Sequence, residues 1–193
     1  MIPYRNETQG VVSLRLFDPA ECREILGRIE LLGGWTVALI RQGLEDGDYG
    51  NVTRPDERSA HILNSVHASW FYREFEQRMF KLVKPLVEQL WKLDLSSCSG
   101  TQLLKYEAAG HYRPHRDTGV DLEQRYFSVV CYLNDDFEGG RTLFPTLDYA
   151  VTPDAGRAVL FPSTYLHGSE PVIDGRKFVL VSWIDGPVPV KWI

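Results

Sequence analysis

The 193-residue chain has few cysteines and no long apolar run. Its three cysteines, Cys22, Cys98 and Cys131, lie far apart and form no CxxC pair. This pattern argues against a disulfide-stabilised secreted domain and against a cysteine-rich zinc site. The first nine residues mix charged and polar side chains, unlike a secretory signal, and no apolar segment has the length of a bilayer-spanning helix. We therefore expect a reduced, cytoplasmic protein without a membrane partner.

A surplus of positive charge is also missing. Lys and Arg together number 21, whereas Asp and Glu number 26, which gives a formal net charge of −5. Nonspecific binding to nucleic acid or to an anionic membrane needs a positive excess, so we expect neither partner. Apolar residues make up 44% of the chain and charged residues 24%, as in ordinary globular proteins. The length is that of one domain.

Helical patterns dominate the N-terminal part of the sequence. One apolar stripe with three- and four-residue steps begins after Asp18, a predicted N-cap, and should end at Gly33-Gly34. A second and wider apolar stripe covers residues 64–93. Pro85 lies inside it and should kink or divide that helix. We expect both helices to support a core formed by the rest of the chain.

Strand patterns begin after the first helix and dominate the C-terminal half. Residues 35–40 predict an isolated early strand, and residues 43–60 predict a long exposed loop, with a lid over a site as the alternative. Beyond residue 100, short β-rich segments alternate with turn signals and have no helices between them. These segments are residues 101–106, 126–133, 157–161 and 178–184. Such a series predicts an antiparallel sandwich or barrel.

Three residues could form a metal site. His115 and Asp117 are two positions apart, so in a strand their side chains share a face. His167 follows 50 residues after Asp117, and an antiparallel barrel could bring it beside the first pair. Two histidines and one carboxylate form the facial triad of non-haem Fe(II) oxygenases, which leaves three coordination positions open. Zinc more often takes a closed tetrahedral site.

A basic residue after His167 could neutralise an organic-acid cosubstrate. Both Arg176 and Lys177 qualify, although each could also be an ordinary basic residue beside a turn at Asp174-Gly175. If that turn closes a regular two-residue hairpin, Arg176 faces the same side as His167. The residues alone leave this choice open.

The strongest pattern is a combination of three segments. They read LLKYEAAGHYRPHRDTG, RYFSVVCYLNDDFEGGRTLFP and FPSTYLHGSEPVIDGRKFVLVSWI, and they cover roughly residues 101–184. Together they resemble the Fe(II)/2-oxoglutarate dioxygenase superfamily, and its prolyl 4-hydroxylase branch most closely. The resemblance implies an α+β, mainly β fold, a double-stranded β-helix (a cupin-like jelly-roll) with supporting N-terminal helices. We expect one domain over 1–193, with a support region at 1–95 and the dioxygenase core at 96–187.

The resemblance also implies a role for individual residues. The expected catalytic metal ligands are His115, Asp117 and His167; the expected 2-oxoglutarate-binding residues are Tyr106, Thr142 and Lys177; the expected substrate-binding residues are Tyr112 and Arg125. In the family the basic residue precedes a strand tryptophan by six positions, as Lys177 precedes Trp183. This spacing favours Lys177 over Arg176, and a bulge near Pro171 would remove the conflict with the hairpin register.

The activity implied by the resemblance is hydroxylation of an unactivated C–H bond. Fe(II), 2-oxoglutarate as cosubstrate and O₂ are the implied cofactors, ascorbate is the implied reductant, and succinate and CO₂ are the coproducts. A prolyl residue in a protein or peptide is the first candidate substrate. The alternatives are a free amino acid or natural-product intermediate and, in another class, a non-catalytic cupin-like module that binds a metal or a small acid.

Overall fold

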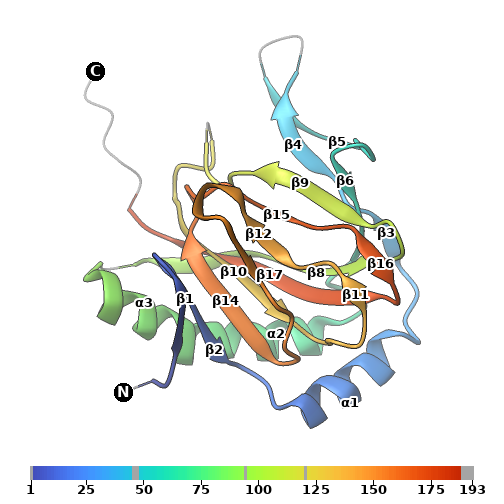
Figure 1. Cartoon of the computed structure of the whole chain (residues 1–193), viewed down its shortest axis with the longest axis horizontal. Helices are drawn as coiled ribbons and strands as arrows, with labels where there is room; N and C mark the ends of the chain where they lie inside the picture. Colours follow the sequence, from blue (N-terminus) through green and yellow to red (C-terminus); the bar gives the residue numbers. More distant parts are fainter. Residues whose placement is uncertain (1, 45–47, 94, 120, 188–193) are drawn as a thin grey trace.

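Two antiparallel sheets face each other, and helices cover the outer face of the larger sheet (Figure 1). The computed structural model describes residues 2–44, 48–93, 95–119 and 121–187. The larger sheet contains, in spatial order, β1 (Arg5–Thr8), β2 (Val11–Arg15), β14 (Arg157–Pro162), β10 (Arg125–Tyr132), β17 (Lys177–Asp185), β8 (Ser97–Tyr106), β7 (His61–Leu63) and β3 (Trp35–Val37).

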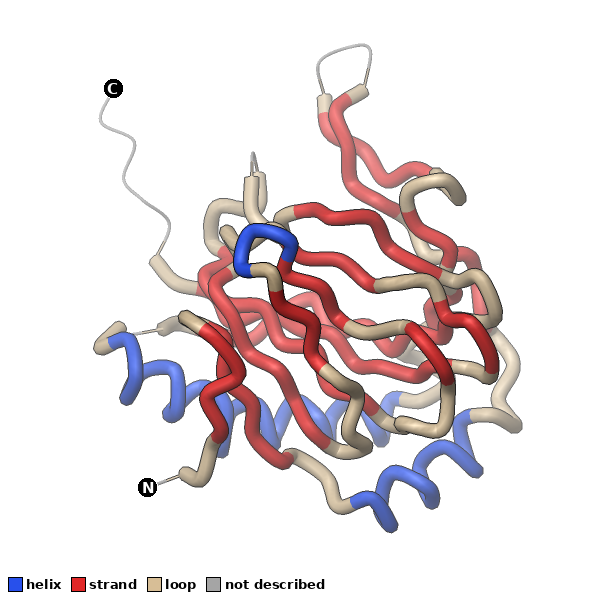
Figure 2. Tube along the Cα trace, viewed as in Figure 1, coloured by secondary structure: helices blue, strands red, loops and turns tan. Residues whose placement is uncertain are grey.

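The smaller sheet packs against the other face of the larger one (Figure 2). It contains β13 (Tyr149–Val151), β12 (Thr142–Phe144), β15 (His167–Ser169), β9 (His111–His115) and β6 (Arg58–Ser59). A 3-10 turn at Pro145–Leu147 joins β12 to β13. Two ribbons complete the β structure: β11 (Glu138–Gly139) with β16 (Val172–Asp174), and β4 (Ile40–Gly43) with β5 (Tyr49–Val52). The predicted mainly β, jelly-roll class is confirmed, as two facing sheets.

Successive side chains of the central strands point to opposite faces of the sheet, and this alternation explains why the core has two layers. On β10, Phe127, Val129 and Cys131 pack toward the helices. The intervening side chains of Val130 and Tyr132 belong to the cluster between the two sheets. Because successive side chains of a strand point to opposite faces, one strand supplies both cores. Three of the four predicted strand segments beyond residue 100 lie within observed strands, and the segment 126–133 ends one residue beyond β10.

The first helix, α1 (Pro19–Ile29), begins as predicted. Asp18 is the N-cap, and its backbone N–H donates to Glu21 Oε2 at 2.8 Å in a capping box. The helix ends at Ile29, before the predicted stop at Gly33-Gly34. Beyond its end Leu31 is 87% exposed, whereas Leu32 of the apolar stripe still packs against the core from outside the helix.

The second helical region begins later than predicted and is divided. It consists of α2 (Ser69–Arg78), a π-helical turn (Met79–Val83) and α3 (Lys84–Trp91). Pro85 is the second residue of α3 and has no N–H to donate to the π-helical turn that runs directly into this helix. The wider π turn precedes it, which agrees with the prediction that Pro85 divides this helix.

Two parts of the N-terminal region differ from the sequence-based expectation. The hairpin of β1 and β2 extends the larger sheet beside β14, where helix had been expected to dominate. Residues 43–60, predicted as a loop, contribute to β4, β5 and β6, and only 45–47 lie outside the described residues. The predicted strand 35–40 is split between β3 and β4. No described helix is both long and apolar enough to span a membrane.

Candidate active site

A cavity of about 490 Å³ lies between the two sheets. The larger sheet contributes side chains of β8, β10 and β17, and the smaller sheet contributes side chains of β6, β9, β12 and β15. The β4–β5 ribbon contributes Ile40, Arg41 and Asn51. All eight site residues predicted from the sequence line this cavity: Tyr106, Tyr112, His115, Asp117, Arg125, Thr142, His167 and Lys177.

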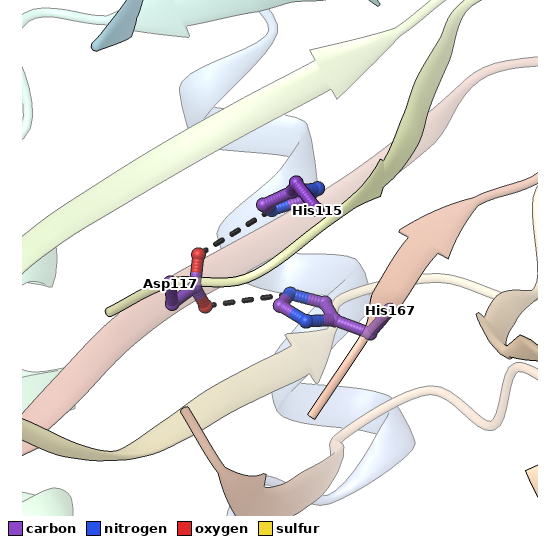
Figure 3. Close-up of side chains that lie close together, drawn as sticks. All are labelled: His115, Asp117 and His167. Carbon is purple, nitrogen blue, oxygen red and sulfur yellow. Dashed lines mark ion pairs between the residues drawn. The ribbon is translucent and has the colours of Figure 1, made fainter. Parts of the chain in front are cut away.

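The three predicted metal ligands meet at one side of the cavity (Figure 3). Antiparallel pairing of β9 with β15 places His115 directly opposite His167, and their ring centroids are 4.4 Å apart. Asp117 follows the end of β9, and its two carboxylate oxygens lie 3.3 Å from Nε2 of His115 and 3.3 Å from Nε2 of His167. One ligand atom from each residue can be chosen so that all lie within 4.8 Å of one another.

Hydrogen bonds orient both imidazoles for metal binding. Nδ1 of His115 lies 2.8 Å from the Arg113 carbonyl oxygen, and Nδ1 of His167 lies 3.0 Å from the Tyr165 carbonyl oxygen. A carbonyl accepts only, so each Nδ1 carries the proton and donates. Each Nε2 therefore turns a lone pair toward Asp117, as in metal-binding histidines whose second nitrogen is bonded to the protein.

Asp117 is held as a carboxylate. Burial alone would raise its pKa, but His167 and His115 hold the pKa well below the usual 3.8. Ser128 Oγ donates to Asp117 Oδ2 at 2.6 Å, and Ser163 Oγ lies 2.9 Å from Ser128 Oγ. Burial lowers the pKa of His115, which favours the neutral imidazole that a metal needs. The described donors thus fit a divalent iron ion with a two-histidine, one-carboxylate face.

Lys177 points into the cavity from β17, and Arg176 does not. The Lys177 side chain is 1% exposed, and its Nζ donates to the Gly140 carbonyl oxygen at 2.7 Å and to Ser169 Oγ at 2.8 Å. Burial lowers the pKa of Lys177 to about 7. The Arg176 side chain is 54% exposed and pairs with Glu30 at 2.7 Å.

The hairpin that favoured Arg176 does not form. β16 pairs with β11, whereas β17 pairs with β8 and β10, so the turn at Asp174-Gly175 connects strands of different sheets. The register argument from a two-residue hairpin was therefore wrong. The six-residue spacing holds: Lys177 and Trp183 both line the cavity from one strand.

The residues expected around 2-oxoglutarate gather near Lys177. Tyr106 is opposite Lys177 in the β8–β17 pairing, and the Lys177 ammonium lies 4.9 Å from the Tyr106 ring centroid. Thr142 is buried on β12, with its Oγ1 2.5 Å from the hydroxyl of Tyr132. Sequence reasoning missed Tyr132 and Ser169, although the strand alternation that places Val130 on the cavity face also places Tyr132 there.

The two residues expected to contact substrate flank the metal ligands. The Tyr112 ring stacks on the His115 ring, with centroids 3.6 Å apart, and burial raises the pKa of Tyr112 to about 12. The guanidinium of Arg125 lies 3.6 Å from the Trp183 ring centroid. Burial lowers the pKa of Arg125, because the charged guanidinium is partly removed from water.

Arg58 is a cavity residue that sequence reasoning also missed. It lies on β6, opposite Tyr112 in the β6–β9 pairing, and only 6% of its surface is exposed. Its guanidinium lies 4.8 Å from the Tyr112 ring centroid. In the sequence, Arg58 is one of several charged residues in the segment that predicted an exposed loop, so no pattern distinguished it.

Comparison with known proteins agrees with this geometry. The model of the 2OG-Fe(II) oxygenase superfamily matches residues 101–185. The chain is 28% identical over 165 residues to prolyl 4-hydroxylase subunit alpha-1 of Gallus gallus, which covers 76% of this chain and 31% of the relative. It is 29% identical over 148 residues to the probable prolyl 4-hydroxylase 3 of Arabidopsis thaliana, which covers 59% of this chain and 52% of the relative. The chain thus spans about a third of one of these curated relatives and about half of the other.

Solved structures share the fold. A prolyl-4-hydroxylase of Pseudomonas putida superposes with a TM-score of 0.64 at 19% identity, covering 92% of this chain and 93% of the other. A prolyl hydroxylase of Trichoplax adhaerens, in complex with a peptide fragment of a hypoxia inducible factor oxygen degradation domain, superposes with a TM-score of 0.68 at 16% identity, covering 92% and 84%. Residues 101–185 therefore match the 2OG-Fe(II) oxygenase superfamily, and the chain is similar to prolyl 4-hydroxylases in sequence and in fold, as the sequence motifs predicted.

Proposed function

We propose that the protein is a 2-oxoglutarate-dependent dioxygenase that hydroxylates a prolyl residue of a protein or peptide and releases succinate and CO₂. The observation that carries the proposal is that one cavity contains both a two-histidine, one-carboxylate cluster and a buried ammonium. A metal site alone needs no buried cation. A cosubstrate with a carboxylate at each end needs a counter-charge at the end remote from the metal.

In this proposal His115, Asp117 and His167 hold Fe(II). When bound, the iron supplies the redox chemistry that couples oxidative decarboxylation of 2-oxoglutarate by O₂ to C–H oxidation. Lys177 binds the distal carboxylate of 2-oxoglutarate, while Tyr106 and Thr142 supply hydroxyl groups. The two sheets limit access of water to these groups, which strengthens their electrostatic interactions.

Tyr112 and Arg125 contact the prime substrate, since both line the cavity beside the metal ligands.

We propose ascorbate as the reductant that keeps the iron divalent, because the resemblance to prolyl 4-hydroxylases implies it. We also propose a cytoplasmic location, which the free thiols of Cys22, Cys98 and Cys131 support.

The test is a coupled assay with the purified chain, Fe(II), 2-oxoglutarate and ascorbate. Succinate is measured together with a 16 Da mass gain on proline-containing peptides, as expected for insertion of one oxygen atom. Substrate-dependent succinate release with the mass gain on proline supports the proposal. Succinate release with oxidation of free amino acids alone would instead support the second candidate, a hydroxylase of free amino acids.

The cupin-like binding module makes a different prediction. It would bind iron but would release no succinate above the level of an Asp117→Ala control. The buried Lys177 argues against this candidate, because a cation without a carboxylate ligand destabilises the fold of a pure metal-binding module.

A further inference from the structure

The cavity has more cations than the proposed cosubstrate needs. Its lining contains five cationic side chains, Arg41, Arg58, Arg116, Arg125 and Lys177, and two acidic ones, Asp117 and Asp121. The chain as a whole carries a formal net charge of −5. Positive charge is therefore concentrated in this cavity against the overall sign, and such a concentration attracts anionic ligands.

Three of the cations already have a role or a partner. Lys177 is assigned to 2-oxoglutarate, and Arg41 forms an ion pair with Asp121. Arg116 donates to the backbone carbonyl of Thr164. With Asp117 assigned to the metal, no acidic side chain of the lining is left for Arg58 or Arg125.

Arg58 is a buried cation with neutral partners only. Its Nη1 donates to the Leu39 carbonyl oxygen at 2.9 Å, and its Nη2 donates to Gln102 Oε1 at 3.2 Å. Its Nε is buried without a hydrogen-bond acceptor. Within the described part of the chain no carboxylate lies at ion-pair distance from Arg58. A buried guanidinium in this state is costly unless an anion compensates its charge.

Arg125, on the larger sheet, has Asp117, Asp185 and Asp121 close enough to act on its charge, although no ion pair joins it to them in the described part of the chain. Its guanidinium lies 3.6 Å from the Trp183 ring centroid, its Nη1 makes a long bond of 3.4 Å to the Asp117 backbone carbonyl oxygen, and its buried Nε has no acceptor. Stacking on tryptophan holds a guanidinium in place and leaves its edge able to bind a carboxylate.

Arg58 is close to two residues with different expected roles, Tyr106 at the 2-oxoglutarate subsite and Tyr112 beside the metal ligands. Lys177 is bonded to Gly140 and Ser169, whereas Arg58 is bonded to Leu39 beside the β4–β5 ribbon. The Tyr112 ring contacts both Arg58 and His115, so Arg58 lies on the side of the metal ligands where the prime substrate is expected.

We propose that Arg58 is a specificity-determining residue that binds a carboxylate of the prime substrate, with Arg125 as the second cation of the same subsite. The inference rests on the proposed function and names its substrate class: a prolyl substrate that carries a carboxylate close to the oxidised ring. The carboxylate belongs to an acidic side chain next to the prolyl residue or to a C-terminal prolyl residue itself.

Matched substrate pairs test the proposal. The pairs are Pro-Glu against Pro-Gln and Glu-Pro against Gln-Pro inside one peptide, a peptide ending in a proline carboxylate against its amide, and free proline against prolinamide. For wild-type protein we expect the charged member of at least one pair to bind at least tenfold more tightly, measured by calorimetry without O₂ in the presence of Fe(II) and 2-oxoglutarate. The pair that shows the preference identifies the source of the carboxylate.

Variants of Arg58 then test whether this residue causes the tighter binding of the charged substrate. Arg58→Gln and Arg58→Met should reduce the preference to less than threefold, and Arg58→Lys should keep part of it, because a point charge remains without the planar fork. The Michaelis constant for 2-oxoglutarate should change less than twofold in Arg58→Gln. Arg54→Gln, a nearby variant of an exposed arginine paired with Asp56, should retain the wild-type preference.

Three results would overturn the proposal. One is an equal affinity of wild-type protein for both members of every pair. Another is an undiminished preference in both neutral variants of Arg58. The third is an increase in the Michaelis constant for 2-oxoglutarate as large as the loss of peptide affinity. Oxidation of none of these substrates despite charge-selective binding would contradict the prolyl hydroxylase function and leave the carboxylate subsite supported.

Discussion

Replacing Lys177 by methionine should stabilise the ligand-free protein while weakening its response to 2-oxoglutarate. Methionine has nearly the length of lysine and no charge, so it fills the same space between β17 and the smaller sheet. The wild-type ammonium is 1% exposed, and its partners, the Gly140 carbonyl and Ser169 Oγ, are neutral. Glu170 acts on this charge without forming an ion pair with it, and replacing a buried charge that has no ion-pair partner by an apolar group often stabilises a protein.

The pKa of Lys177 gives the size of the effect. Burial lowers it from 10.5 to about 7, which corresponds to a destabilisation of about 5 kcal/mol when the lysine is protonated in both states. Methionine leaves the Gly140 carbonyl and Ser169 Oγ without their donor, at about 1–2 kcal/mol each. The expected net gain is therefore about 1–3 kcal/mol, or several degrees in melting temperature for a chain of this length.

The stability gained by the Lys177→Met substitution should decrease as the pH rises. The folded-state pKa of Lys177 is below the unfolded-state value, so between pH 7 and 10.5 the unfolded wild-type chain binds more protons. Wild-type stability therefore rises with pH in this window, and the destabilisation by the buried charge is complete only below pH 7. By pH 9 it should have fallen to about 2 kcal/mol, so the advantage of the Lys177→Met variant should be lost there.

Thermal unfolding of both proteins at pH 6 and pH 9 measures this difference, since all other titrating groups are common to both. With metal already present in both samples, added 2-oxoglutarate should raise the wild-type melting temperature further and should raise that of the variant much less. The matched control is Arg176→Met, which removes an exposed ion pair with Glu30, worth at most about 1 kcal/mol, and a guanidinium contact 5.9 Å from the Phe178 ring centroid. If Lys177→Met is less stable than wild type at pH 6, the reasoning about the buried charge is refuted.

Three further predictions concern the metal, the substrate and the core. Asp117→Ala should abolish iron binding and turnover, and full iron content by elemental analysis with normal turnover would contradict the metal assignment. Substitution of Tyr112 by Phe or of Arg125 by Gln should reduce hydroxylation while much of the substrate-independent decay of 2-oxoglutarate persists; equal loss of both activities would count against a role in substrate binding. Phe75→Ala removes a fully buried ring of α2 and should lower the free energy of unfolding by about 3–5 kcal/mol in a denaturant titration, whereas a loss below 1 kcal/mol would show that the helices contribute little to the core.

Local sequence patterns were sufficient to predict the strands that build the site. Short β-rich segments between turn signals identified β10 and β17. The family resemblance supplied the six-residue interval between Lys177 and Trp183, which places both side chains on one face. The interval is even, and every side chain at an even spacing shares a face of a strand. This argument needed no knowledge of the partner strand, which explains why it succeeded.

Pairing between strands could not be predicted in the same way. The turn at Asp174-Gly175 has the composition of a hairpin turn, but β16 leaves the larger sheet to pair with β11. Register across a turn depends on which strand becomes the neighbour, and this choice is made by long-range packing. The β1–β2 hairpin was missed for a related reason, since its edge position beside β14 provides the packing that fixes it.

The same limit applies to Arg58. A buried arginine in a segment rich in charged residues has no sequence signature, because burial of a charge is decided by the tertiary fold and opposed by desolvation. Only the pairing of β6 with β9 shows that Arg58 lies beside Tyr112 inside the cavity.

The location of the cavity cations explains how the fold tolerates them. Lys177 is on β17, between β10 and β8, and Arg125 is on β10, between β14 and β17. Strands paired on both sides fix the direction of their side chains, and the helix-covered face of the same strands forms the larger apolar core. The apolar face offsets the desolvation of the cations on the other face. Since the cations cannot turn away to water, an anionic ligand that enters the cavity meets charges already in position, and its binding removes a cost that the ligand-free fold carries.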